Sequence, residues 1–131
     1  MPVLRRIDNV MFRVSDLDRA ARFYESEMGM RRAWTDTERG QIGFLFAEGG
    51  SEIVIHTDPA IPSPDLSFLV DDVVAFCEDH RRHGHTVRRE PTDVRCGKLA
   101  LLEDPDGNLV QIIDLSWFGG AARYADRILG G

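Results

Sequence analysis

Five polar side chains in or beside predicted strands could do chemistry in this 131-residue chain: His56, Asp65, Gln111, Asn9 and Arg13. His56 is the one histidine predicted to lie in a strand, where an imidazole could act as a general base or bind a metal ion. Asp65 could orient or ionise His56 if both face the same side, which would make a catalytic proton-transfer pair. The alternatives are a hydrogen-bonded histidine without chemistry and an aspartate that caps the start of a strand in water.

Gln111 interrupts the apolar predicted strand 109–115 (LVQIIDL). A buried amide without partners costs about 1–3 kcal/mol in mutational data, so Gln111 needs a partner or an open cleft. We expect Gln111, and by the same reasoning Asn9, to hydrogen-bond a substrate or a water molecule.

Arg13 shares one predicted strand face with Asn9 and Met11 because side chains alternate along a strand. If that face is a cleft, Arg13 is suited to a carboxylate, a phosphate or another anion, although an ion pair with a neighbouring acid is an equally ordinary role. Trp34 could line an aromatic pocket, whereas aromatic residues on strands more often belong to a core. Asn9, Met11, Arg13, Trp34 and Gln111 are therefore the predicted substrate-binding residues.

Hydrophobic periodicity predicts the elements that position these side chains. A strand over 7–14 precedes a helix over 16–28, with N-cap chemistry at Asp16 and a glycine at position 29 for its end. Three strands follow, and after three prolines in residues 59–64 the same pattern restarts. The predicted strands are 7–14, 31–37, 41–47, 52–57, 66–70, 87–90, 99–102 and 109–115, with a second helix between Asp72 and Gly84 and a turn at 104–108.

This order predicts an α+β fold made of two βαβββ modules. The first module covers residues 1–58, a proline-rich linker covers 59–64, the second module covers 65–116, and the tail 117–131 is expected to add a short helix. One helix cannot cover both faces of a four-stranded sheet, so we expect paired curved mixed sheets around a cleft, within one chain or across a dimer.

Composition excludes several functions. A net charge of −6 disfavours nucleic-acid binding, and no apolar run approaches the roughly 20 residues of a membrane span. The first residues show no secretory signal, and two cysteines, Cys77 and Cys96, do not make a disulfide framework. We expect a cytoplasmic protein with reduced thiols that contacts neither nucleic acid nor membrane.

Two segments carry a family resemblance, residues 12–24 (FRVSDLDRAARFY) and residues 103–108 (EDPDGN). Together with the module repeat, they resemble the vicinal oxygen chelate superfamily, which includes glyoxalase I, bleomycin-resistance proteins and extradiol dioxygenases. The resemblance implies a homodimer whose cleft holds a divalent metal ion, bound by His and Glu residues from the first and last strand of each module. It also places Arg13 where glyoxalase I contacts the carboxylate of its thiol cofactor.

Carried over by position, this ligand quartet falls on Asn9, His56, Asp65 and Gln111. One imidazole, one carboxylate and two amides thus replace the His and Glu ligands, and amide carbonyls are weak ligands for Zn²⁺ or Fe²⁺. We therefore assign no cofactor, and keep a divalent metal at His56, Asp65 and Gln111 as the alternative.

Three functions remain open at this stage. The favoured one is a metal-free or weakly metal-dependent protein that binds a small hydrophobic or anionic molecule. The alternative is a divalent-metal-dependent lyase, isomerase or dioxygenase with an unusual ligand set, so whether the chain is an enzyme stays undecided. The third is a protein–protein module that uses the cleft for dimerisation alone.

Overall fold

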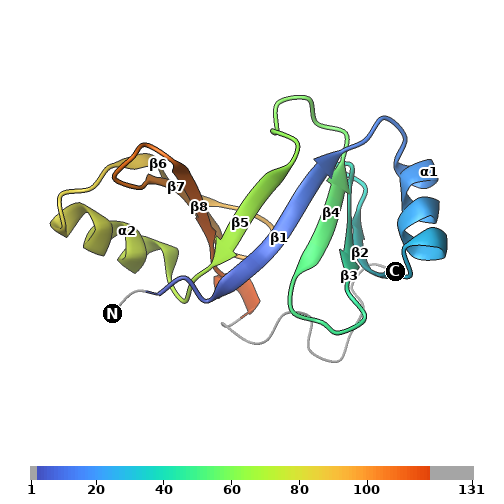
Figure 1. Cartoon of the computed structure of the whole chain (residues 1–131), viewed down its shortest axis with the longest axis horizontal. Helices are drawn as coiled ribbons and strands as arrows, with labels where there is room; N and C mark the ends of the chain where they lie inside the picture. The colour runs from blue at the N-terminus through green and yellow to red at the C-terminus, as the bar shows by residue number, and fades with distance from the viewer. Residues whose placement is uncertain (1–2, 119–131) are drawn as a thin grey trace. The chain divides into compact units, whose positions relative to one another are not determined.

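The computed structural model describes residues 3–118, which hold eight strands and two α-helices (Figure 1). Contacts divide this part of the chain into two units. Residues 9–66 form the first unit, and residues 3–8 together with residues 67–118 form the second.

The first unit has one helix and a four-stranded arrangement in the order β2-β3-β4-β1. Strands β1 and β4 run parallel, whereas β2, β3 and β4 pair in antiparallel fashion. The Asp16 side chain begins α1 by accepting from the Arg19 N–H at 3.0 Å. The elements are β1 (Arg6–Arg13), α1 (Leu17–Arg22), a π-helical turn (Phe23–Glu27), β2 (Arg31–Asp36), β3 (Gln41–Leu45) and β4 (Glu52–His56).

Helix α1 covers one side of these strands with an apolar core. Alternate residues of β3 and β4 reach this core, so the other alternate residues must face away from α1. The buried members of the core are Ala21, Met30, Ile42, Phe44 and Ile55.

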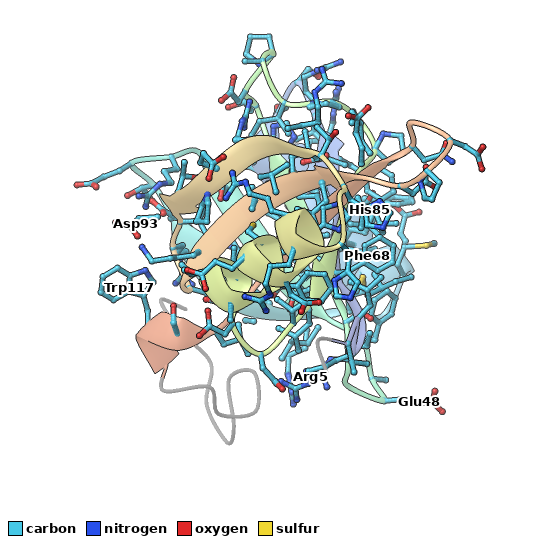
Figure 2. All side chains as sticks on the ribbon, turned by 90° about the vertical axis from the view of Figure 1, so that its left-hand side faces the viewer. Arg5, Glu48, Phe68, His85, Asp93 and Trp117 are labelled. Carbon is cyan, nitrogen blue, oxygen red and sulfur yellow. The ribbon has the colours of Figure 1, made fainter. Side chains whose placement is uncertain are left out.

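The second unit repeats the arrangement in the order β5-β8-β7-β6, with β5 parallel to β8. Asp72 begins its helix by accepting from the Ala75 N–H at 3.0 Å. Helix α2 packs on β6 and β7, as Figures 1 and 2 show. The elements are β5 (Asp65–Leu69), α2 (Val73–Arg82), β6 (Val87–Asp93), β7 (Lys98–Glu103), β8 (Leu109–Ile113) and a 3-10 turn (Ser116–Phe118).

The predicted α+β class with two βαβββ modules is confirmed, with two local corrections. The helix predicted over 16–28 changes to a wider turn at Phe23, because the Met28 N–H donates to the Phe23 carbonyl five residues earlier, at 3.1 Å. The strand predicted over 87–90 continues to Asp93, and its Pro91 is tolerated because β6 lies at the end of its strand order.

Other predictions about organisation stay predictions. The module boundaries and the cleft belong to this group, and the helix expected in the tail falls on residues 119–131, outside the described residues. Within residues 3–118, no helix has the length and apolarity that a bilayer crossing requires.

Candidate functional site

Strand register places a set of mainly polar side chains on one face of the first unit. Strands β1 and β4 pair with Asn9 beside Glu52 and Arg13 beside His56, and paired residues point to the same side of a sheet. This side is opposite to α1, because Ile55 points to the helix. We call it the polar face and define it as Asn9, Met11, Arg13, Trp34, Gln41, Leu45, Glu52, Val54 and His56.

His56 ends β4 on this face and is fully buried. Its Nδ1 accepts a hydrogen bond from the backbone N–H of Asp58 at 3.0 Å. A nitrogen that accepts carries no proton, so the neutral ring holds its proton on Nε2. Nε2 is buried and has no hydrogen-bond partner in the described part of the chain. An unsatisfied buried donor is unfavourable, and a ligand with an acceptor atom would satisfy it.

Charged neighbours from three segments act on this ring. Burial lowers the pKa of His56; Asp58 and Asp65 raise it and Arg13 lowers it, and the net shift is downward. His56 is therefore neutral at pH 7. The first unit thus brings the two predicted catalytic residues, His56 and Asp65, within electrostatic reach of each other.

Acid is expected to destabilise the fold through His56. A lowered pKa means that the unfolded chain binds this proton more readily, so the free energy of unfolding falls as the pH drops below about 6.5. The variant His56→Asn can keep an acceptor for the Asp58 N–H but cannot titrate. Urea unfolding between about pH 5 and pH 7.5 should show that the free energy of unfolding falls less with acid in the variant than in the wild type. Equal losses in the two proteins would contradict this role of His56.

Arg13 contacts the chain segment that follows β4. Its Nη1 donates to the carbonyl oxygens of Ile61 at 2.8 Å and Pro59 at 3.3 Å. Its backbone N–H donates to Ser63 Oγ at 3.0 Å. The proline-rich residues 58–64 are thus an ordered segment bound to the end of β1. The role of Arg13 toward an anion stays a prediction.

Trp34 lies against the backbone of β3 at Gly43. It is 3% exposed, and its Nε1 donates to Glu52 Oε2 at 3.2 Å. A Cβ added at Gly43 would overlap the indole ring, so only glycine leaves room for it. Trp34 and Met11 both belong to the polar face, and their contact with a substrate stays a prediction.

Sequence reasoning missed Glu52. This carboxylate is 4% exposed and lies beside Asn9 on the neighbouring strand. The signal was present, because the strand EIVIH begins with an acidic residue two positions before Val54, which therefore lies on the same face.

Gln111 belongs to the second unit and has a partner there. Its Nε2 donates to Ser67 Oγ at 2.7 Å, which answers the requirement that a half-buried amide be satisfied. Its contact with a substrate, and its place in a ligand set with His56 and Asp65, remain predictions.

The described side chains do not supply a metal site of the kind that the fold implies. Residues 3–118 contain no group of three or more His, Cys, Asp or Glu side chains placed to hold one ion. On the polar face, the Asp58 N–H occupies His56 Nδ1 and Trp34 donates to the Glu52 carboxylate. These residues do not fit a divalent cation, and we derive no step through one.

Comparison with known proteins identifies the family. The sequence model of the Glyoxalase/Bleomycin resistance protein/Dioxygenase superfamily matches residues 6–112. The chain belongs to this superfamily. The lactoylglutathione lyase of Haemophilus influenzae is 31% identical over 124 residues, which cover 83% of this chain and 92% of that protein. A probable lactoylglutathione lyase of Vibrio cholerae is 30% identical over 82% of this chain and 89% of its own length.

Solved structures that are similar to this chain have the same fold. A variant of Streptomyces coelicolor methylmalonyl-CoA epimerase in complex with 2-nitronate-propionyl-CoA has a TM-score of 0.60 at 24% identity, covering 84% of this chain and 96% of that chain. The epimerase from Mycobacterium tuberculosis has a TM-score of 0.58 at 20% identity, with 83% and 87% covered. At this identity the likeness concerns the fold alone.

Proposed function

We propose that this superfamily member binds a small molecule on the polar face and that His56 donates its Nε2 proton to an acceptor atom of that ligand. The observation that carries the proposal is the Nε2 atom, which is buried and has no hydrogen-bond partner among the described residues. The other ring nitrogen, Nδ1, accepts a hydrogen bond from the Asp58 N–H at 3.0 Å. The ring can therefore donate a hydrogen bond from Nε2. An acceptor atom of a ligand would satisfy this buried donor, which is unfavourable without a partner.

We also propose a role for His56 and Asp65 in proton transfer. The neutral ring donates a hydrogen bond from Nε2 without losing that proton. Proton uptake by His56 would require Nδ1 to give up the Asp58 N–H, and the Asp65 carboxylate would then stabilise the protonated ring. Met11 and Val54 are apolar side chains that lie between the polar groups on this face. These groups support a small hydrophobic ligand with at least one acceptor atom, and an anionic one if Arg13 also contacts it.

The second candidate is lyase chemistry, and the relatives favour it. Two relatives at 30–31% identity, which this chain matches over about nine tenths of their length, are named as a lactoylglutathione lyase and a probable lactoylglutathione lyase. We propose lactoylglutathione as the first substrate to test.

We also propose that the protein is a cytoplasmic homodimer. Cys77 is a buried free thiol, which supports a reducing compartment. The homodimer is proposed by likeness to the superfamily.

The test compares the wild type with His56→Ala and His56→Gln. Binding is measured by calorimetry against a panel of small aromatic and anionic compounds, and turnover is measured with lactoylglutathione. For a binder, His56→Ala should weaken the best compound by about three- to tenfold, the value of one neutral hydrogen bond, while His56→Gln, whose amide can donate, should keep more of the affinity. Unchanged affinity in His56→Ala would overturn the proposed contact.

Turnover decides between the two candidates. If the wild type converts lactoylglutathione and His56→Ala does not, the lyase reading replaces the binder reading. Elemental analysis of untagged protein accompanies this assay. About one equivalent of metal per chain, lost in His56→Ala, would contradict the metal-free site.

A further inference from the structure

We propose that Arg13 is a positioning residue: it holds residues 58–64 against the end of β1, and this segment fixes the proton of His56 on Nε2. The proposal goes beyond the binding role of His56 and assigns Arg13 a task inside the protein. It differs from the expectation that Arg13 recognises an anion, and it can be tested without a ligand.

The first step is the contact between Arg13 and the segment. Nη1 lies 2.8 Å from the Ile61 carbonyl oxygen and 3.3 Å from that of Pro59, and the backbone N–H of Arg13 donates to Ser63 Oγ. A charged donor makes stronger hydrogen bonds than a neutral one. Three contacts from one residue thus hold both the middle and the end of the segment.

The second step is the rigidity of the segment itself. Asp58 Oδ1 accepts from the Ala60 N–H at 2.8 Å, and the Asp58 carbonyl accepts from the Ile61 N–H at 3.3 Å. Pro59 and Pro62 have fixed φ angles, which removes backbone freedom on both sides of this turn. The hydrogen bonds from Arg13 to the carbonyl groups of Pro59 and Ile61 therefore also fix the position of the Asp58 N–H.

The third step is the effect on the imidazole. The backbone of His56 is held in place because its carbonyl accepts from the Val14 N–H at 2.8 Å. A free neutral imidazole exchanges its proton between the two ring nitrogens. The Asp58 N–H can only donate, so while it lies 3.0 Å from Nδ1 the proton must stay on Nε2.

Charge on the polar face agrees with this role. The Arg13 guanidinium also lowers the pKa of His56, although less than burial does, and so favours the neutral ring that the Asp58 N–H requires. Asp58 and Asp65, from the segment and from β5, oppose this effect, so loss of Arg13 removes a contribution that keeps the ring uncharged. The ligand's use of the Nε2 proton rests on the proposed function, whereas the position of the proton does not.

The experiment is nitrogen NMR of protein with ¹⁵N-labelled histidine at neutral pH, with His56 assigned by comparison with His56→Asn. The wild type should show one pyridine-type nitrogen at Nδ1 and one pyrrole-type nitrogen at Nε2. In Arg13→Met, which keeps length but cannot donate, His56 should show averaged nitrogens from a mixture of tautomers. Arg13→Lys, which can still donate to a carbonyl, should restore at least part of the wild-type pattern.

Amide hydrogen exchange gives a second measurement on the same variants. The amides of Asp58 and Ile61 should exchange about tenfold faster in Arg13→Met, which corresponds to about 1.4 kcal/mol of local opening. The control is Arg39→Gln, which removes an exposed arginine bonded to Asp36 at 2.9 Å in the same unit and should leave both measurements unchanged. If Arg13→Met does not fold, the wild-type spectrum and Arg13→Lys carry the test.

Two results would overturn the proposal. One is a wild-type His56 with its proton on Nδ1, and the other is an Arg13→Met variant with an unchanged tautomer and unchanged exchange. Failure of the proposed function looks different. In that case the tautomer depends on Arg13 as described, but no compound of the panel loses affinity in His56→Ala.

Discussion

Replacing Asp114 with alanine is expected to lower the free energy of unfolding by about 3 kcal/mol or more, because each buried donor left without an acceptor costs about 1–3 kcal/mol. This carboxylate is 2% exposed and lies in the second unit just after β8. It accepts from the backbone N–H groups of Val73 at 2.9 Å and Lys98 at 2.9 Å, and from the N–H and hydroxyl of Ser116 at 3.1 and 2.7 Å. Alanine leaves these donors unsatisfied at the start of α2 and β7.

Burial alone would raise the pKa of Asp114, but these hydrogen bonds together lower it below the usual range. The stabilisation is therefore complete at neutral pH and is lost as the pH falls through the folded-state pKa. Urea unfolding at neutral pH checks the magnitude. The control is Asp93→Ala, because Asp93 makes an exposed ion pair with Lys98 that should contribute little to stability. Similar losses for the two variants would contradict the network.

Replacing Gly43 with alanine is expected to displace Trp34 and to cost about 1–3 kcal/mol or more, the range for overpacking a well-filled site. The added methyl group would overlap the indole atoms Nε1, Cε2 and Cζ2. Trp34 would have to leave the backbone of β3, and its hydrogen bond to Glu52 would break. The polar face would then lose the Trp34 side chain, and the buried Glu52 carboxylate would lose a hydrogen-bond donor.

Tryptophan fluorescence follows this displacement directly. The measurement is made in a Trp117→Phe background, because Trp117 is 60% exposed and would dominate the signal. We expect emission from Trp34 to shift to longer wavelength in Gly43→Ala. A Trp34→Leu background supplies the control, since without the indole ring the same methyl group should cost much less. An equal loss with and without Trp34 would show that the clash is not the cause.

Most of the fold could be predicted from the sequence because local chemistry and long-range packing agree. Asp16 and Asp72 were predicted to begin the two helices, and both accept the expected backbone N–H. The apolar alternation of 7–14 and 52–57 predicted β1 and β4 within one or two residues. The π-helical turn could not be predicted, since a five-residue hydrogen bond and a four-residue one leave nearly the same apolar pattern over a single turn.

The strand faces of the candidate residues could be predicted from the sequence, but their contacts could not. Alternation alone placed Asn9, Met11 and Arg13 on one strand face, and the pairing of Arg13 with His56 agrees with it. The hydrogen bond that sets the His56 tautomer comes from the backbone N–H of Asp58. Almost every residue type has a backbone N–H, so the sequence does not indicate this donor. Arg13 donates to the carbonyl groups of residues 59 and 61, which lie 46 and 48 residues later in the sequence. These contacts therefore depend on strand pairing rather than on local pattern.

The discontinuous second unit has a consequence for synthesis on the ribosome. The Arg5 N–H donates to the Leu69 carbonyl at 2.8 Å, and the Arg5 guanidinium pairs with Asp71 at 3.0 Å. Residues 9–66 are complete as soon as residue 66 has emerged, whereas residues 3–8 must wait until the chain beyond position 67 is made. Closing that loop of about 60 residues carries an entropy penalty that local contacts avoid. Residues 3–8 thus reach their native neighbours later than residues 9–66, which follow them in the chain.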